Sequence, residues 1–180
     1  MSGDSVSFLE RRCVDVIRNA FMMMLNEADR IVSTGTMGTS TTFDIYSNML
    51  RNVRNWNSRI IHDQTIIAKK RDQKLEYFFK LAFTHLIKNN FTRNIKGEPM
   101  EVRINIPPLD NFIHMLFVRT AEHARVKSMF DNPADLESIA KDAMHDALFD
   151  CADGYVTVEP MKVSSPYRSS MGRSRLAARI

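Results

Sequence analysis

The spacing of apolar residues predicts that most of this chain is α-helical. From residue 6 to residue 31 apolar side chains recur every three or four positions, which keeps them on one face of a single long helix. Gly35 follows this segment and suits the left-handed residue at which helices commonly end. The face consists of Val6, Leu9, Cys13, Ile17, Phe21, Met24, Ala28 and Ile31.

Five further helices follow from the same periodicity. They are expected over residues 43–55, 58–70, 72–89, 109–126 and about 133–152. Thr41 or Thr42 can cap the first of these, and Pro133 suits the first turn of the last, where its missing N–H costs nothing. Residues 72–89 carry a wide apolar face, which is typical of a central core helix. In residues 58–70 the apolar positions are isoleucines: Ile60, Ile61, Ile66 and Ile67.

A different pattern appears between the fourth and fifth helices. Apolar and polar side chains alternate over residues 100–106, as in a half-buried strand, and residues 91–95 also favour a strand. A stretch with Gly97 and Pro99 separates them, so we expect a β-hairpin near 91–106. Such a hairpin must pack on helices or pair with another chain, because alone it is marginal in water. Residues 155–160 favour a short edge strand.

The predicted fold class is therefore mainly α, with five to six helices, one small β-hairpin and an extended basic C-terminal arm. Residues 1–160 form the helical domain, and residues 161–180 form a tail that is flexible or ordered by a partner. The tail contains few apolar residues, so it cannot offset the entropy of ordering by itself.

Charge divides along the same boundary. The formal net charge is +4, with 25 basic and 21 acidic residues. Five cations and no acid lie between residues 162 and 180: Lys162, Arg168, Arg173, Arg175 and Arg179. The body is therefore almost neutral, and the tail is the segment most suited to bind a partner. An acidic groove on a protein, an anionic membrane face or nucleic acid would fit it.

Candidate chemistry in the body is sparse. Cys13 and Cys151 are far apart and have no metal-ligand spacing, which indicates reduced thiols in a cytosol-like compartment. The loop at 34–42 lacks the lysine and the preceding strand of a phosphate-binding loop. His145 lies between two acids and fits a surface ion pair better than a ligand. The sequence predicts no enzyme, cofactor, metal site or small-molecule substrate, and no basic stripe with interleaved aromatic residues.

No signal peptide or membrane span is expected either. The first residues lack a basic and then apolar order, and no apolar run approaches the ~20 residues that cross a bilayer.

Three stretches together resemble a known family. They are DIYSNMLRNVRNWNSRIIHDQT (44–65), INIPPLDNFIHMLFVRTAEHA (104–124) and SIAKDAMHDAL (138–148). Their order is similar to that in minor capsid proteins of large nucleocytoplasmic DNA viruses, over roughly residues 40–150. The Met-rich first helix and the arginine tail depart from that pattern.

The resemblance implies a virion protein that is made in the host cytoplasm and cements capsomers beneath the major capsid lattice. Its partners would be other capsid proteins, and a dimer is also expected because a narrow helical body often completes its core against a copy. Pro107, Phe112 and His114 are carried over as partner-contact residues from the matched motif. The alternative function is a nucleic-acid-binding accessory or assembly protein that uses its basic tail.

Overall fold

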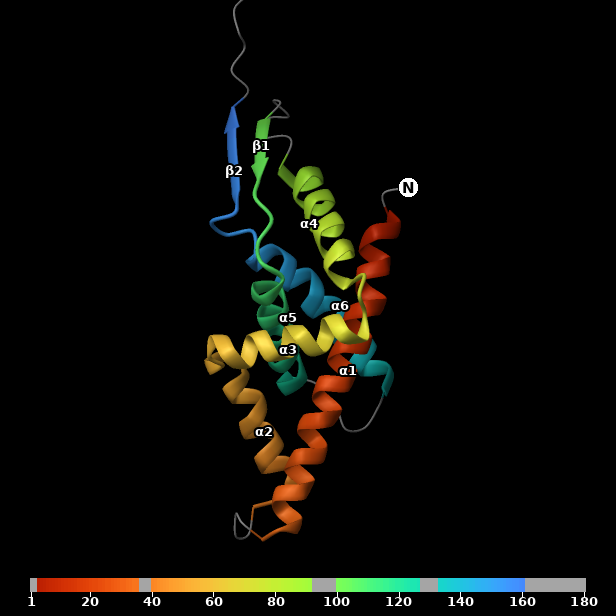
Figure 1. Ribbon diagram of the computed structural model, residues 1–180, viewed down its shortest axis with the longest axis vertical. Helices are drawn as coiled ribbons and strands as arrows, with labels where there is room; N and C mark the ends of the chain where they lie inside the picture. The colour runs from red at the N-terminus through yellow and green to blue at the C-terminus, as the bar shows by residue number, and fades with distance from the viewer. Residues whose placement is uncertain (1–2, 36–39, 92–99, 127–132, 161–180) are drawn as a thin grey trace, which may run out of the picture.

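A computed structural model describes residues 3–35, 40–91, 100–126 and 133–160 of the chain. Six α-helices, one short 3-10 helix and two strands follow one another in this part (Figure 1). In order they are α1 Gly3–Ser33, α2 Thr42–Asn52, η1 Val53–Asn55, α3 Ser58–Arg71, α4 Leu75–Phe91, β1 Met100–Ile104, α5 Leu109–Val126, α6 Pro133–Asp150 and β2 Val156–Pro160. The mainly α fold class is confirmed.

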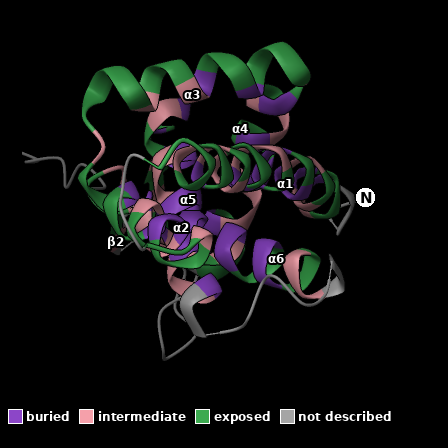
Figure 2. Cartoon of the chain, turned by 90° about the horizontal axis from the view of Figure 1, so that it is seen from below, coloured by how far each residue is buried: buried purple, intermediate pink, exposed green. Residues whose placement is uncertain are grey.

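The helices are arranged around α5. α1 runs through much of the length of the molecule, and α3 lies across that long direction (Figure 1). The two strands extend beside α4 at one end. Seen along the long axis, α3 and α6 lie at opposite sides, with α1 and α5 between them (Figure 2). Most residues of α3 are exposed, whereas buried residues gather on α5 and on the helix faces turned toward it (Figure 2).

Aromatic side chains form the centre of the core. Phe112 of α5 stacks on Phe79 of α4 with ring centroids 4.5 Å apart, and both side chains are fully buried. One helical turn further along α5, Phe117 meets the edge of Trp56 at 5.6 Å and the ring of Phe21 at 6.3 Å. α5 therefore joins α1, the α2–α3 connection and α4 through a single apolar face.

Helix ends follow local sequence rules. Thr41 caps α2 with a capping box, in which Asp44 N donates to Thr41 Oγ1 and Thr41 N donates to the Asp44 carboxylate. Asn57 caps α3 by accepting from Ile60 N at 2.9 Å. Gly35 and Gly154 follow α1 and α6 with φ of 66° and 74°, a conformation that residues with a Cβ adopt at a cost.

The strand at 100–104 finds its described partner far along the chain. β1 pairs antiparallel with β2 in the register Val102↔Val158, so α5 and α6 lie between the two strands. The hairpin predicted near 91–106 differs from this arrangement: Phe91 ends α4, and residues 92–99 lie outside the described residues. Alternation identified the strand, but it carries no information about a partner more than fifty residues away.

Truncating the central aromatic stack tests this core. We expect Phe112→Ala to lower the free energy of unfolding by about 3–5 kcal/mol, because it leaves a cavity against Phe79. Phe149→Ala is the control, since Phe149 on α6 is 43% exposed and should cost less than about 1 kcal/mol. Urea unfolding followed by circular dichroism measures both, and equal losses would contradict the assignment of Phe112 to the core.

Candidate partner-binding site

The cations predicted to bind a partner lie in the tail. Lys162, Arg168, Arg173, Arg175 and Arg179 all fall outside the described residues. Their assignment stays a prediction from charge alone.

The second predicted set is mostly internal. Phe112 is fully buried against Phe79, and Pro107 is buried where the chain enters α5. Assigning these two as contact residues is corrected by this burial, because neither side chain offers surface to a partner. His114 is half-buried, and its Nε2 donates to the carbonyl oxygen of Val53 at 3.1 Å. This hydrogen bond joins α5 to η1. The three residues carried over from the motif at 104–124 therefore lie in or beside the core.

Both cysteines belong to the core. Cys13 and Cys151 are buried free thiols. Burial raises the pKa of the Cys13 thiol far above its usual range and that of Cys151 to about 12. A thiol in such surroundings remains protonated and a poor nucleophile, so these two residues supply packing volume in the described chain.

Histidines bridge pairs of helices. His62 Nδ1 of α3 donates to Asp110 of α5 at 3.1 Å, and His123 Nε2 of α5 donates to Asp146 of α6 at 3.0 Å. His145, expected to pair on its own helix, instead reaches Glu10 of α1 at 3.2 Å. Within the described residues no group of three His, Cys, Asp or Glu could hold a metal ion.

α3 turns most of its apolar residues outward. Its buried residues are Thr65 and Ala68, whereas Ile60 is 38% exposed and Ile67 37%. A helix that packs on a core usually shows the opposite distribution. Of the four isoleucines in this segment, Ile61 is half-buried and the other three form part of the surface.

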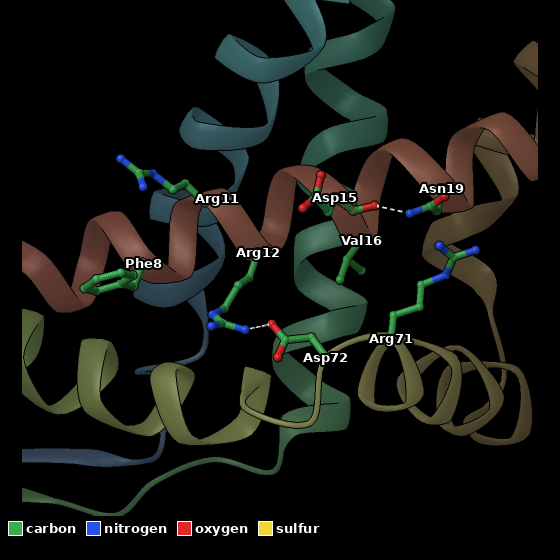
Figure 3. Close-up of a pocket in the computed structure, with 8 residues that line it drawn as sticks. All are labelled: Phe8, Arg11, Arg12, Asp15, Val16, Asn19, Arg71 and Asp72. Carbon is green, nitrogen blue, oxygen red and sulfur yellow. Dashed lines mark hydrogen bonds and ion pairs between the residues drawn. The ribbon is translucent and has the colours of Figure 1, made fainter.

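A hollow of about 580 Å³ lies where α1 meets the end of α3 and the start of α4 (Figure 3). Arg12 points from α1 to Asp72 and pairs with its carboxylate. The Arg12 guanidinium also lies 4.5 Å from the centroid of the Phe78 ring, which in turn contacts Phe8 at 5.4 Å. Cation–π contact and ion pairing together hold this arginine in place.

The hollow carries more cationic than anionic groups. Arg71 extends from the end of α3 toward α1, and Arg11 stands at the rim, turned away from the Arg12–Asp72 pair (Figure 3). Asp72 is held by Arg12, and Asp15 pairs with Arg18 at 3.2 Å. Arg12 Nε is a buried donor without an acceptor among the described residues. The three arginines that line the hollow thus exceed its two carboxylates.

A second hollow of about 540 Å³ lies between α3, the start of α4 and the start of α5. Glu76 at its edge accepts from Lys69 Nζ and from Lys80 Nζ, each at 2.8 Å. These two hydrogen bonds lower the pKa of the Glu76 carboxyl to about 2. The charges that line this site are therefore largely matched within the chain: His62 with Asp110, and Lys69 with Glu76.

The shifted Glu76 predicts a pH dependence of stability. Its folded pKa lies below its unfolded value of 4.5, so its contribution is complete above pH 4.5 and declines as the pH falls toward 2. We expect Glu76→Gln to cost about 0.5–1 kcal/mol near pH 7, because the pair is partly exposed, and less at pH 3. Urea unfolding at both pH values measures this.

Glu137→Gln provides the control for this test. Glu137 lies 3.8 Å from Lys141 on the exposed face of α6, so its loss should change stability by only a few tenths of a kcal/mol. A Glu76 effect that is the same at pH 7 and pH 3 would contradict the assignment of the effect to its charge.

Sequence reasoning missed the arginine-lined hollow. The Arg11–Arg12 pair and the run Lys69–Lys70–Arg71 are visible in the sequence, but alone each reads as a solvated helix face. Only the fold brings them together, because Arg12 and Asp72 are sixty residues apart. The hollow combines Arg12, Arg71 and Phe8 with two carboxylates, so it is not a continuous basic stripe.

Among the described residues, each helix is too short or too polar to cross a membrane.

Comparison with known proteins gives one family. A family model described as "Family of unknown function (DUF5764)" matches residues 5–134, from the first turns of α1 to the start of α6. No curated protein and no solved structure matches the chain significantly. The matched region includes every residue that lines the arginine-rich hollow. Because the match covers well over half of the chain, this protein belongs to the DUF5764 family.

Proposed function

We propose that this protein is a structural interaction protein that works as a viral minor capsid protein, cementing capsomers beneath the major capsid lattice. The capsid role rests on the resemblance of residues 40–150 to such proteins in sequence. The broader role, adhesion to other proteins without reaction chemistry, rests on the surface described above.

The outward isoleucines of α3 are the observation that carries the proposal. A surface helix normally buries its apolar residues, yet α3 buries Thr65 and exposes Ile60, Ile66 and Ile67. Burying a fully exposed isoleucine side chain contributes roughly 1.5–3 kcal/mol, and Ile60, Ile66 and Ile67 are 37–38% exposed, so each forgoes only about a third of that stabilisation. A partner that covers them would recover it, which favours an adhesive role for this helix.

The use of titratable groups supports the same conclusion. Arg119 of α5 pairs with Asp150 of α6 at 2.5 Å and with Glu122 at 3.0 Å, which raises the pKa of its guanidinium further. The histidines join helices in the same way. These groups hold helices together, which suits a protein whose task is to keep a fixed shape.

The particle provides the direct test of the capsid role. We expect the chain to be present in purified intact virions in a fixed ratio to the major capsid protein, with crosslinks from α3 lysines to capsid proteins. Quantitative mass spectrometry of the particles measures both. Absence from intact particles would remove the capsid role.

The tail has a separate test. Deleting residues 161–180 should weaken association with the partner, because it removes a tethered cationic contact. A variant of the same length, with Arg168, Arg173, Arg175 and Arg179 replaced by glutamine, should bind the partner as weakly as the deletion does. Its binding should also depend less on salt concentration than that of the unchanged chain. Co-sedimentation with assembled capsid protein measures both, and full binding by either variant would exclude a role for the tail charges.

A further inference from the structure

Charge is divided between two helices on opposite sides of the body. α3 has four cations and one acid, whereas α6 has five acids and one lysine. Their formal net charges are therefore +3 and −4. α3 and α6 lie at opposite sides of the molecule, with α1 and α5 between them (Figure 2). The body, almost neutral as a whole, thus has a cationic side and an anionic side.

The outer side of α3 joins an apolar part to free positive charge. Ile60, Ile67 and Lys70 are separated by seven and three residues, so they share one side of the helix, and all three are exposed. Lys70 and the neighbouring Arg71 form no ion pair with another residue in the described part of the chain. Asp63 is the one acid of this helix. This surface is therefore apolar toward its beginning and middle and cationic at its C-terminal end.

α6 presents a surface of the opposite charge. Asp142, Asp146 and Phe149 are separated by four and three residues, share one side of the helix and are all exposed. Asp146 pairs with His123 at 3.0 Å, whereas Asp142 has no ion-pair partner among the residues that the structure describes. Phe149 is 43% exposed. The surface is therefore acidic in its middle and apolar at its C-terminal end.

The two surfaces match when the helices run antiparallel. The isoleucines of α3 then lie on Phe149, while Lys70 lies near Asp142. Asp142 and Phe149 are about 10 Å apart along α6, and Ile60 and Lys70 about 15 Å apart along α3, at the rise of an α-helix. The apolar and the charged parts of the two helices therefore meet in the same alignment.

The fold already sets this relative direction. In Figure 1 α3 runs from left to right, and α6 runs obliquely from right to left on the far side of α1. A second copy stacked along the viewing direction, without rotation, would bring its α3 against α6 of the first in the antiparallel sense. Stacking by translation alone needs no rearrangement of either helix.

We propose that the protein associates head to tail, with α3 of one copy packed antiparallel on α6 of the next. The proposal rests on the adhesive role in the proposed function and names one partner, a second copy of this chain. Because the two surfaces lie on opposite sides of the body, each added copy leaves one α3 and one α6 open. Such a contact is heterologous, so it builds a row of copies instead of closing as a dimer.

Charge argues against a closed dimer through either surface. Two α3 surfaces would bring two helices of net charge +3 together, and two α6 surfaces would bring two of net charge −4 together. Like charges across an interface oppose association. The cationic tail at 161–180 is the competing occupant of α6, because it also has the opposite charge. Its contribution is separated from that of α3 in the test below.

Analytical ultracentrifugation of the full chain tests the proposal. The weight-average mass should rise with concentration from the 20.7 kDa of one chain past the mass of a dimer, and it should fall as salt is added. Lys70→Glu and Asp142→Lys should each weaken self-association by at least about fivefold, because each places like charges in contact. The two changes combined in one chain should restore association, since the charges are then exchanged.

Matched controls carry the same charge changes on other helices. Lys88 on α4 and Asp29 on α1 are both exposed. Lys88→Glu and Asp29→Lys should leave self-association within about twofold of that of the unchanged chain, because neither residue lies on α3 or α6.

Mixing two blocked chains distinguishes a row from a closed dimer. Ile67→Asp blocks the α3 surface, and Phe149→Asp blocks the α6 surface, so each chain alone should stay monomeric. Their mixture retains one intact α3 and one intact α6, and it should form a complex of one copy of each that grows no further. If Ile67→Asp fails to fold by circular dichroism, Ile67→Gln replaces it.

Four results would overturn the proposal. They are a chain that stays monomeric at every concentration, self-association that survives both Lys70→Glu and Asp142→Lys, a Phe149→Asp chain that associates as well as the unchanged one, and a mixture of blocked chains that stays monomeric. Association that is lost on deleting residues 161–180 but kept in Lys70→Glu would assign the contact to the tail. No capsid protein is present in these measurements, so failure here and absence from particles are separate results.

Discussion

The burial of α5 is the constraint on which the rest of the fold depends. Its apolar face is covered by rings from α1, α4 and the α2–α3 connection: Phe21, Phe79 and Trp56. Its polar residues bind a further neighbour, α6, where Arg119 pairs with Asp150 and His123 with Asp146. Because α5 packs against so many neighbouring elements, those elements cannot shift far without opening the core.

That arrangement leaves α3 at the margin. Its inward residues are small or hydroxylated, Thr65 and Ala68, and its link to α5 includes the exposed His62–Asp110 pair. Ile60, Ile66 and Ile67 are partly exposed, and exposed residues predominate along α3 (Figure 2). The partly exposed isoleucines are the physical result of this marginal position.

The spacing of apolar residues and the residues at helix ends predicted most elements. Contacts between residues far apart in the sequence could be found only in the structure. Period and end signals identified α1 and α2, because Gly35 and Thr41 act within a turn of where they stand, and apolar period identified α5. Strand alternation identified β1 but could not choose β2 as its partner. The arginine-rich hollow escaped prediction for the same reason, since Arg12 and Arg71 line one hollow only in the folded chain.

Native-state hydrogen exchange of the full chain tests this account most directly. If α5 is the central core helix and α3 packs only at its margin, amides of Phe112 to Phe117 should exchange only through global unfolding. Amides of Ile61 to Ile67 should then exchange through a local opening of lower free energy. Equal protection of the two helices, or faster exchange in α5, would contradict the central role given to α5.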